Sequence, residues 1–265
     1  MRLKGKTAIV IGAGQGPGTG LGNGRATVLR FAQEGAQVMA VDRDLGSARE
    51  TVAMAKGGEC FAYEADVTRE ATLAAAVAAA QERWGRIDIL HYNVGVSIAG
   101  GDASPTEITE EAFDRVVAIN LRGAVMACKH VLPIMRAQKS GCILMISSLA
   151  AVEKYPLVAY KATKAAMIAY TQQLAIQNAE YGVRANVILP GLMDTPMAVD
   201  TRARATGKSR AEIAAMRDAK VPLRHKMGTA WDVANAALFL ASDEAGFITG
   251  VSLLVDGGGA LNVGH

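Results

Sequence analysis

The chain has 265 residues, of which 51% are hydrophobic and 20% are charged, a composition typical of a globular protein that can bury a full core. Its formal net charge is only +3, and its lysines and arginines are scattered along the chain, which argues against nucleic acid as a partner. Neither a secretory signal peptide nor an apolar run of membrane-spanning length is evident, so we expect a cytoplasmic protein that contacts no membrane.

Predicted strands and helices alternate along the chain. Short apolar or β-branched runs predict seven strands: Thr7–Ile11, Gln37–Val41, Cys60–Glu64, Ile87–His91, Cys142–Ser147, Arg184–Leu189 and Ser252–Val255. The segments between them predict helices: Gly24–Glu34, Leu45–Lys56, Glu70–Trp84, Thr109–Gln138, Val158–Tyr181 and Ala230–Ser242. Most of the strands are apolar on both faces, as parallel strands are when helices cover each side of the sheet. We therefore predict an α/β protein with a single domain over residues 1–265, a Rossmann-like doubly wound fold whose seven-stranded parallel sheet is flanked by helices.

Residues 195–228 interrupt this alternation because they contain no clear strand. Apolar spacing around Ile213 and Met216 predicts a substrate lid, mobile when the site is empty, rather than disorder. Basic residues outnumber acidic ones in this lid. That charge can attract an anionic substrate, or it can simply be a solvated surface.

A glycine-rich loop runs from Gly12, after the first strand, to Gly24. Glycines between a strand and a helix let the backbone approach a pyrophosphate, whose charge the amide groups at the positive helix end can bind. Overlapping Gly-x-x-x-Gly-x-Gly frames leave the register open. Because Pro17 is unsuited to a helix interior and Gly24 opens a helix-forming run, we predict that Gly22, Asn23 and Gly24 form the pyrophosphate turn; a flexible surface loop is the alternative.

Asp42 closes the second predicted strand, about 30 residues beyond the start of this loop. A carboxylate there can accept hydrogen bonds from the ribose hydroxyls of the cofactor and would repel a 2′-phosphate, which favours NAD over NADP. The neighbouring guanidinium of Arg43 could instead receive a phosphate. We expect NAD.

Tyr160 and Lys164 lie four positions apart on a predicted helix, and therefore on one face of it. A free tyrosine has a pKa of about 10, which a nearby ammonium lowers. Such a tyrosine can remove the hydroxyl proton of an alcohol, or donate a proton to a ketone in the reverse direction. A lone pair of this kind is usually an ordinary helix surface, so its neighbours along the chain decide its meaning.

Those neighbours follow the order of the short-chain dehydrogenase/reductase family, which the sequence resembles over nearly its full length. The matching positions are Asp66-Val67, Asn93-Val-Gly95, Asn120, Ser147-Ser148, Tyr160-Lys-Ala-Thr-Lys164, Pro190-Gly191 with Thr195, and Val255-Asp-Gly-Gly. Tyr92 and Val94 depart from the usual Asn-Asn-Ala-Gly strand end. The resemblance implies a homotetramer that acts on a small-molecule alcohol or ketone.

The resemblance also implies a role for each matched residue. The catalytic set is Asn120, Ser148, Tyr160 and Lys164, in which Ser148 orients the substrate oxygen and Asn120 holds a water next to Lys164. Motif position selects Ser148, although the usual interval to the tyrosine selects Ser147. The implied cofactor-binding set is Gly12, Gly14, Gly22, Asn23, Asp42, Asp66, Val67, Asn93, Tyr160, Lys164, Pro190, Met193 and Thr195. In this set Asp66 and Val67 hold adenine, and Thr195 binds the carboxamide.

The glycine loop is longer than the usual family form and has the length seen in enoyl-acyl carrier protein reductases. Those enzymes place the tyrosine and lysine farther apart than Tyr160 and Lys164, so we expect alcohol–ketone chemistry instead. An NAD-binding redox sensor and a non-redox epimerase or dehydratase remain as alternatives on the same fold. The four histidines and three cysteines show no ligand spacing, so no metal is expected.

Overall fold

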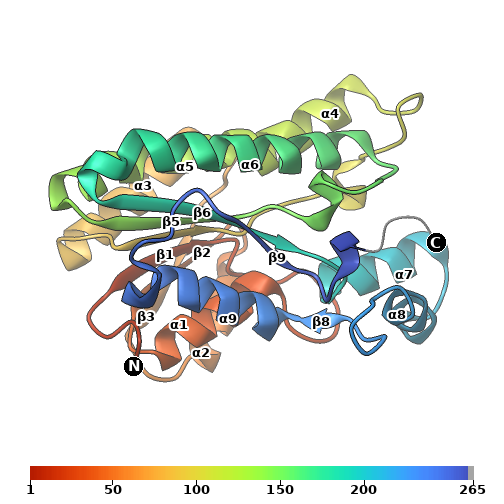
Figure 1. Cartoon of the computed structure of the whole chain (residues 1–265), viewed down its shortest axis with the longest axis horizontal. Coiled ribbons are helices and arrows are strands. Elements are labelled where there is room, and N and C mark those ends of the chain that lie inside the picture. The colour runs from red at the N-terminus through yellow and green to blue at the C-terminus, as the bar shows by residue number, and fades with distance from the viewer. Residues whose placement is uncertain (262–265) are drawn as a thin grey trace.

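The computed structural model describes residues 1–261, and its centre is one parallel sheet (Figure 1). Seven strands form this sheet: β1 (Thr7–Ile11), β2 (Gln37–Asp42), β3 (Cys60–Glu64), β4 (Ile89–Tyr92), β5 (Gly141–Ile146), β6 (Val183–Pro190) and β9 (Ser252–Val255). Their order across the sheet is β3-β2-β1-β4-β5-β6-β9, and every neighbouring pair is parallel. The predicted seven-stranded doubly wound fold is confirmed.

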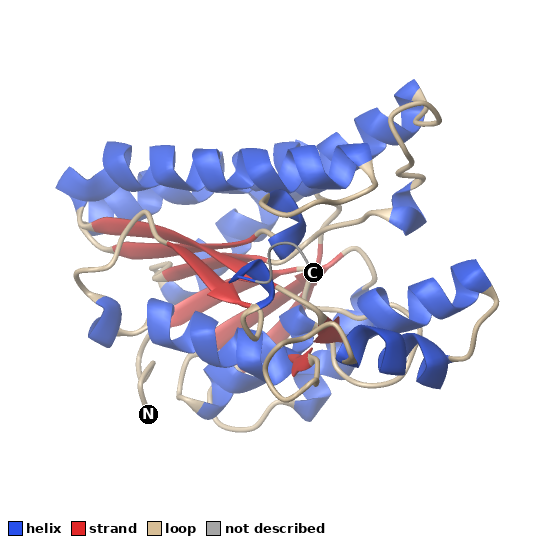
Figure 2. Ribbon diagram, turned by 45° about the vertical axis from the view of Figure 1, so that its right-hand side comes forward, coloured by secondary structure: helices blue, strands red, loops and turns tan. Residues whose placement is uncertain are grey.

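Helices cover both faces of the sheet (Figures 1 and 2). One layer contains α1 (Asn23–Gln33), α2 (Leu45–Met54) and α9 (Ala230–Ala241), and the other contains α3 (Glu70–Trp84), α4 (Glu110–Val117), α5 (Gly123–Gln138) and α6 (Val158–Asn178). Alternate residues of β1 enter the two cores, with Ile9 and Ile11 on one side and Ala8 and Val10 on the other. This two-sided burial explains why the strands are apolar on both faces.

The long helix predicted over Thr109–Gln138 is not continuous. A π-helical turn, Ala118–Arg122, separates α4 from α5. Hydrophobic periodicity does not reveal such a turn because it inserts a single extra residue into an otherwise helical run. By length and composition alone, Glu110–Gln138 could also cross a membrane. In the fold, however, α5 packs against α3 and α4 packs against α6, as the core helices of a layered protein do.

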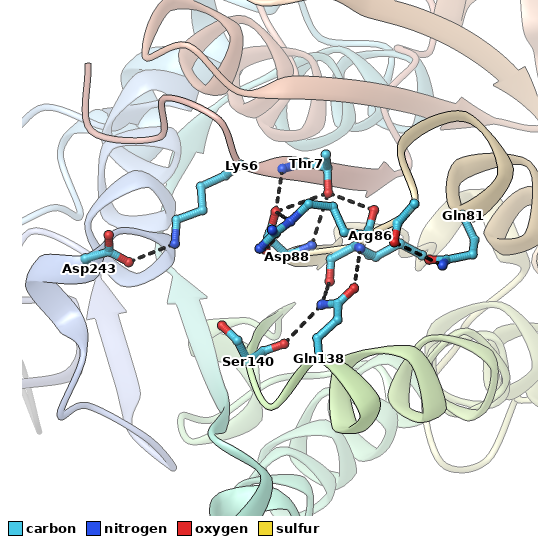
Figure 3. Close-up of polar contacts among 10 residues, drawn as sticks. Lys6, Thr7, Gln81, Arg86, Asp88, Gln138, Ser140 and Asp243 are labelled. Carbon is cyan, nitrogen blue, oxygen red and sulfur yellow. Dashed lines mark hydrogen bonds and ion pairs between the residues drawn. The ribbon is translucent and has the colours of Figure 1, made fainter.

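At the amino-terminal end of the sheet, polar side chains form hydrogen bonds and ion pairs with one another and with the backbone (Figure 3). Buried Asp88 accepts hydrogen bonds from the Thr7 backbone N–H at 2.9 Å and from Arg86 Nη2 at 2.6 Å. The Gln138 side chain bonds to both backbone polar groups of Ile87 at 2.8 Å. Ligands of doubly wound folds bind at the opposite, carboxyl end of the strands, and the candidate site lies there.

The expected lid, residues 195–228, is a small helical segment beyond one end of the sheet (Figure 2). It contains a π-helical turn (Pro196–Asp200), α7 (Thr201–Thr206) and α8 (Arg210–Asp218) around a small apolar cluster. Its two ends are joined by a two-stranded parallel ladder of β7 (Met193–Asp194) and β8 (Gly228–Thr229). The β7–β8 ladder therefore fixes the two ends of this segment next to each other, and the segment has a small apolar core of its own.

Candidate active site

The site begins where the chain order reverses in the sheet, between the carboxyl ends of β1 and β4. Gly12 follows β1 and Asn93 follows β4. Asn93 Nδ2 donates to the Gly12 carbonyl oxygen at 3.1 Å, which ties the two strand ends together. Such a reversal point is where doubly wound folds bind their ligands.

Helix α1 begins against this crevice, and no side chain closes its first turn. Its N-cap is Gly22, and neither a side-chain cap nor an acidic residue is present there, so backbone N–H groups stay available to an anion. A Cβ on Gly24 would lie 1.9 Å from the Gly12 carbonyl oxygen, which shows how closely the helix approaches the strand end. The Asn23 Oδ1 atom is buried with no partner among the described residues. The available N–H groups and the close approach of the backbone fit the pyrophosphate of a dinucleotide, whereas Asn23 Oδ1 can only accept a hydrogen bond from a donor.

Gln15 braces the glycine loop from within. Its Oε1 accepts a hydrogen bond from the Gly22 N–H at 2.7 Å, and its Nε2 donates to the Gly20 carbonyl at 3.0 Å. The backbone N–H of Gln15 in turn donates to Ser47 Oγ, at the start of α2, at 2.8 Å. The loop is thus held by defined contacts, unlike a flexible surface loop.

The outer part of the same loop contacts the lid. Asp200 Oδ1 accepts from the Thr19 N–H at 3.2 Å, and Arg204 Nη1 donates to the Pro17 carbonyl at 3.2 Å. Arg210 holds Asp200 in place through Nε at 3.3 Å. The added length of the loop, unexplained in the sequence, therefore joins the candidate cofactor site to the lid.

Two carboxylates mark the expected adenosine end of the crevice. Asp42 Oδ2 accepts from the Gly14 N–H at 2.8 Å, and a Cβ on Gly14 would press on that carboxyl group. Burial raises the pKa of Asp66, but hydrogen bonds from Thr68 and the positive charge of Arg43 outweigh it, so this pKa falls below its usual range. Arg43 itself is exposed. A carboxylate and an open guanidinium thus stand next to each other at this corner.

Helix α6 carries Tyr160 and Lys164 on one face, beside the ends of β4 and β5. Buried Asp102 accepts hydrogen bonds from the backbone N–H groups of Ala159 at 2.9 Å and Tyr160 at 2.8 Å, and so anchors the first turn of α6. Buried Lys164 donates from Nζ to the Ile146 carbonyl at 2.7 Å and stands 5.7 Å from the centroid of the Tyr160 ring. Asp102 was missed in the sequence because its partner helix begins more than 50 residues later.

The two adjacent serines have different surroundings. Ser147 is buried, and its hydroxyl donates to the Lys164 carbonyl at 2.6 Å. Ser148 caps a 3-10 turn by accepting from the Ala150 N–H at 3.2 Å, and its hydroxyl is the one that acts on Tyr160 by lowering the pKa of the phenol. Ser148, and not Ser147, therefore faces the phenol.

Burial shifts the pKa values of both Tyr160 and Lys164. Burial raises the pKa of Tyr160 to about 12, although the Ser148 hydroxyl opposes the rise. Burial also lowers the pKa of Lys164 to about 7. Desolvation is the largest influence on both groups, so the lowering of the Tyr160 pKa by Lys164 stays a prediction for the site.

Asn120 lies in the π-helical turn and connects two segments of the site. Its Oδ1 accepts from the Val96 N–H at 2.8 Å, while Nδ2 donates to the Val96 carbonyl at 3.0 Å and to Thr163 Oγ1 at 3.1 Å. Both amide N–H donors are used, so a water at Asn120 would bind the remaining lone pair of Oδ1 or a backbone carbonyl of the turn. The contacts show Asn120 fixing the loop after β4 against α6.

The remaining expected cofactor residues lie at or beyond the carboxyl ends of β6 and β3, and all of them are buried. Pro190 ends β6, Met193 begins β7 and is buried, and Thr195 accepts from the Ala198 N–H at 3.3 Å to cap the lid's first turn. Val67 is buried near the start of α5 and has little surface left for adenine. Within residues 1–261, no three His, Cys, Asp or Glu side chains gather as a metal site.

Comparisons with known proteins show which proteins this chain resembles in sequence and fold. A family model described as Enoyl-(Acyl carrier protein) reductase matches residues 18–260. Oxidoreductase UcpA of Salmonella typhimurium is 39% identical over 98% of this chain and 96% of its own length, and 2-(R)-hydroxypropyl-CoM dehydrogenase of Xanthobacter autotrophicus is 34% identical over 95% and 97%. A crystal structure from Burkholderia xenovorans, described as a short-chain dehydrogenase/reductase, superposes with a TM-score of 0.91 at 42% identity and covers 99% of both chains.

The match therefore extends over both sequence and fold. The chain belongs to the short-chain dehydrogenase/reductase family and is an oxidoreductase of that type.

Proposed function

We propose that the protein catalyses the NAD-dependent interconversion of a secondary alcohol and a ketone, with Tyr160 as the general base or acid. The observation that carries this proposal is the convergence of Tyr160, Ser148 and Lys164 at the crevice that the Gly12–Gly24 loop opens. A bound nicotinamide would supply the hydride acceptor or donor and, when oxidised, a positive charge near the phenol.

The chain's own residues move the proton and orient the substrate. The Ser148 hydroxyl is close enough to Tyr160 to lower the pKa of the phenol, so an alcohol or ketone oxygen placed between the two hydroxyls could bond to both. With its pKa raised, Tyr160 is protonated at neutral pH and ready to donate to a ketone. Oxidation requires a positive charge near the phenol that lowers this pKa again.

The names of relatives give mixed indications of the substrate. The family model is named for enoyl reductases, whereas one relative is named as a dehydrogenase of a hydroxypropyl compound. The four-residue spacing of Tyr160 and Lys164 on a single helix favours alcohol–ketone chemistry over enoyl reduction. We accordingly place the proton transfer on an alcohol or ketone oxygen.

A panel of secondary alcohols and ketones, assayed with NAD(H) and NADP(H) in parallel, tests this function. We expect a change in nicotinamide absorbance with at least one alcohol–ketone pair, and faster turnover with NAD(H). Tight NAD binding with no turnover of any pair would favour a redox sensor. Conversion of a substrate without net change in bound NAD would favour an epimerase or dehydratase.

Asp42→Ala is expected to reverse the cofactor preference from NAD to NADP. The substitution removes the carboxylate that would repel a 2′-phosphate and leaves the exposed guanidinium of Arg43 to receive it. The measurement is kcat/KM for both cofactors. Arg43→Ala is the matched control and should weaken the use of NADP while changing that of NAD little. Equal use of both cofactors by the unmodified protein would refute the assignment of Asp42.

A further inference from the structure

Tyr160 belongs to the first turn of α6, and no side chain of the helix itself holds that turn. The N-cap residue is Leu157, which provides no side-chain cap, and the first turn contains no acidic residue. Residues 152–154, which lead into the helix, are exposed. The first turn of a helix contains unpaired N–H groups and is prone to fraying. The phenol proposed to transfer the proton is therefore attached to a turn that needs support from elsewhere.

A segment far earlier in the chain supplies this support. The Asp102 carboxylate accepts from the Ala159 N–H through Oδ1 at 2.9 Å and from the Tyr160 N–H through Oδ2 at 2.8 Å. The Ala103 carbonyl accepts from the Val158 N–H at 3.0 Å. The N–H groups at the start of α6 are thus bonded by residues 102 and 103 and not by a cap of the helix itself.

The charge of Asp102 makes this contact stronger than an ordinary cap. Asp102 is only 7% exposed, and no cation forms a salt bridge with it in the part of the chain that the structure describes. A buried carboxylate needs hydrogen-bond donors, and the positive end of a helix also stabilises it. Both are present at the start of α6. A hydrogen bond from an N–H group to a carboxylate is roughly twice as strong as one between neutral groups.

The loop that carries Asp102 is itself fixed to the end of β4. The Asp102 N–H donates to the Ser97 carbonyl at 3.3 Å. Both backbone polar groups of Val96 bond to the Asn120 side chain, at 2.8 and 3.0 Å. A Cβ on Gly100 would lie 2.9 Å from Val96 Cγ2, so the loop is also tightly packed. The first turn of α6 therefore cannot move relative to β4 unless its bonds to Asp102 break.

We propose that Asp102 is a positioning residue for the reaction, which holds the backbone of Tyr160 where its hydroxyl can exchange a proton with the substrate. Asp102 acts through Tyr160 and not on the substrate. A misplacement of about 1 Å can lower an enzymatic rate by about 10²-fold, so this contact affects turnover as well as folding. Lys164 is held separately, by the Ile146 carbonyl at 2.7 Å. The inference rests on the proposed function, because it explains how the proton-transferring group of the same site is held.

Asp102→Ala tests the inference by removing both bonds to the start of α6. We expect kcat, counted per NAD-binding site, to fall by about 10- to 100-fold, while the affinity for NAD changes little. The solvent deuterium isotope effect on kcat should increase, because the slowed proton transfer limits the rate. Asp102→Asn keeps one acceptor oxygen but loses the charge, and should lie between Asp102→Ala and the unmodified protein.

Asp88→Ala is the matched control for the loss of a buried carboxylate. Asp88 is 4% exposed and accepts from the Thr7 N–H at 2.9 Å, but it lies at the opposite end of the sheet. This variant should have a lower melting temperature, yet keep kcat per NAD-binding site and the solvent isotope effect of the unmodified protein. A loss of kcat in Asp88→Ala as large as that in Asp102→Ala would indicate general destabilisation and would overturn the inference.

A new cap on α6 separates helix stability from positioning. A serine at an N-cap accepts from the second or third N–H of its helix, here that of Ala159 or Tyr160. Leu157 already has the extended backbone of a cap, with φ −101° and ψ 135°. Asp102→Ala combined with Leu157→Ser should recover melting temperature but not kcat, because the new cap does not join α6 to the loop after β4. Leu157→Ser alone is the reference.

Recovery of kcat together with the melting temperature would overturn the inference, since Asp102 would then only stabilise the helix. Should Asp102→Ala fail to fold, Asp102→Asn takes its place in every comparison, with and without Leu157→Ser. An Asp102→Asn variant whose kcat and solvent isotope effect equal those of the unmodified protein would contradict the role of the charge-assisted bonds.

A measurement without turnover keeps this inference separate from the proposed function. In protein labelled with ¹³C at the Cζ of tyrosine, the Tyr160 signal is identified by its loss in Tyr160→Phe. It should shift in Asp102→Ala, stay shifted when Leu157→Ser is added, and not shift in Asp88→Ala. An unshifted signal in Asp102→Ala would overturn the inference whether or not the protein oxidises an alcohol. A shifted signal in a protein that oxidises or reduces nothing would refute the proposed function and leave the positioning of Tyr160 by Asp102 standing.

Discussion

Tyr160→Phe is expected to lower kcat for alcohol oxidation and ketone reduction by about 10²- to 10⁴-fold, the usual contribution of a positioned general acid–base. The substitution removes only the phenolic hydroxyl and keeps the ring, whose centroid lies 5.6 Å from that of Tyr155. The protein should therefore fold and bind NAD nearly as before. Steady-state rates with a turned-over alcohol–ketone pair, together with NAD binding followed by fluorescence, provide the measurement.

The pH dependence gives a second readout of the same residue. A general base acts when deprotonated, so kcat/KM for oxidation should rise with pH toward the pKa of Tyr160, and this rise should disappear in Tyr160→Phe. Tyr170→Phe is the matched control, since Tyr170 is on the same helix but packs, partly buried, against the core that contains Cys128. Activity of Tyr160→Phe comparable to that of Tyr170→Phe would contradict the catalytic assignment.

The parts of the site that the sequence predicts well are those that local spacing determines. Tyr160 and Lys164 share one helix, so their spacing alone places them on one face. Gly24 and Gly12 flank a strand-to-helix turn, and the glycines themselves indicate that the backbone segments approach each other closely there. The sheet is predictable for a similar reason, because two-sided burial produces continuous apolar runs.

Contacts between distant segments could not be predicted in this way. Asp102 anchors α6, and Asp200 holds the glycine loop, through bonds that join residues far apart in the chain. The choice between Ser147 and Ser148 depends on which side of the strand end each one faces, and a one-residue difference reverses that side. The raised pKa of Tyr160 depends on desolvation, which only the packed structure reveals.

His91→Leu is expected to make the protein less sensitive to acid. His91 lies on central strand β4, fully buried, with neither ring nitrogen bonded among the described residues and with Phe31 packed edge-on at 6.2 Å. Burial lowers its pKa from 6.5 to about 3, so the folded protein keeps this ring neutral while the unfolded chain protonates it. Above pH 6.5, protonation of His91 does not change the free energy of unfolding. Below pH 6.5, it lowers this free energy by about 1.4 kcal/mol for each pH unit, down to the folded pKa.

Urea unfolding at fixed protein concentration, between pH 5 and pH 7.5, measures this dependence. The difference in unfolding free energy between His91→Leu and the unmodified protein should grow by about 1.4 kcal/mol per pH unit as the pH falls below 6.5, because all other titrating groups are common to both proteins. His225→Gln replaces an exposed histidine of the lid and should leave the slope unchanged. A slope in His91→Leu identical to that of the unmodified protein would mean that the folded state protonates His91 as readily as the unfolded chain does. The substitution also removes two unpaired ring nitrogens from the core, so the free energy of unfolding at pH 7.5 should be equal or higher in His91→Leu. Such a result would indicate that His91 has no role in the chemistry of the site.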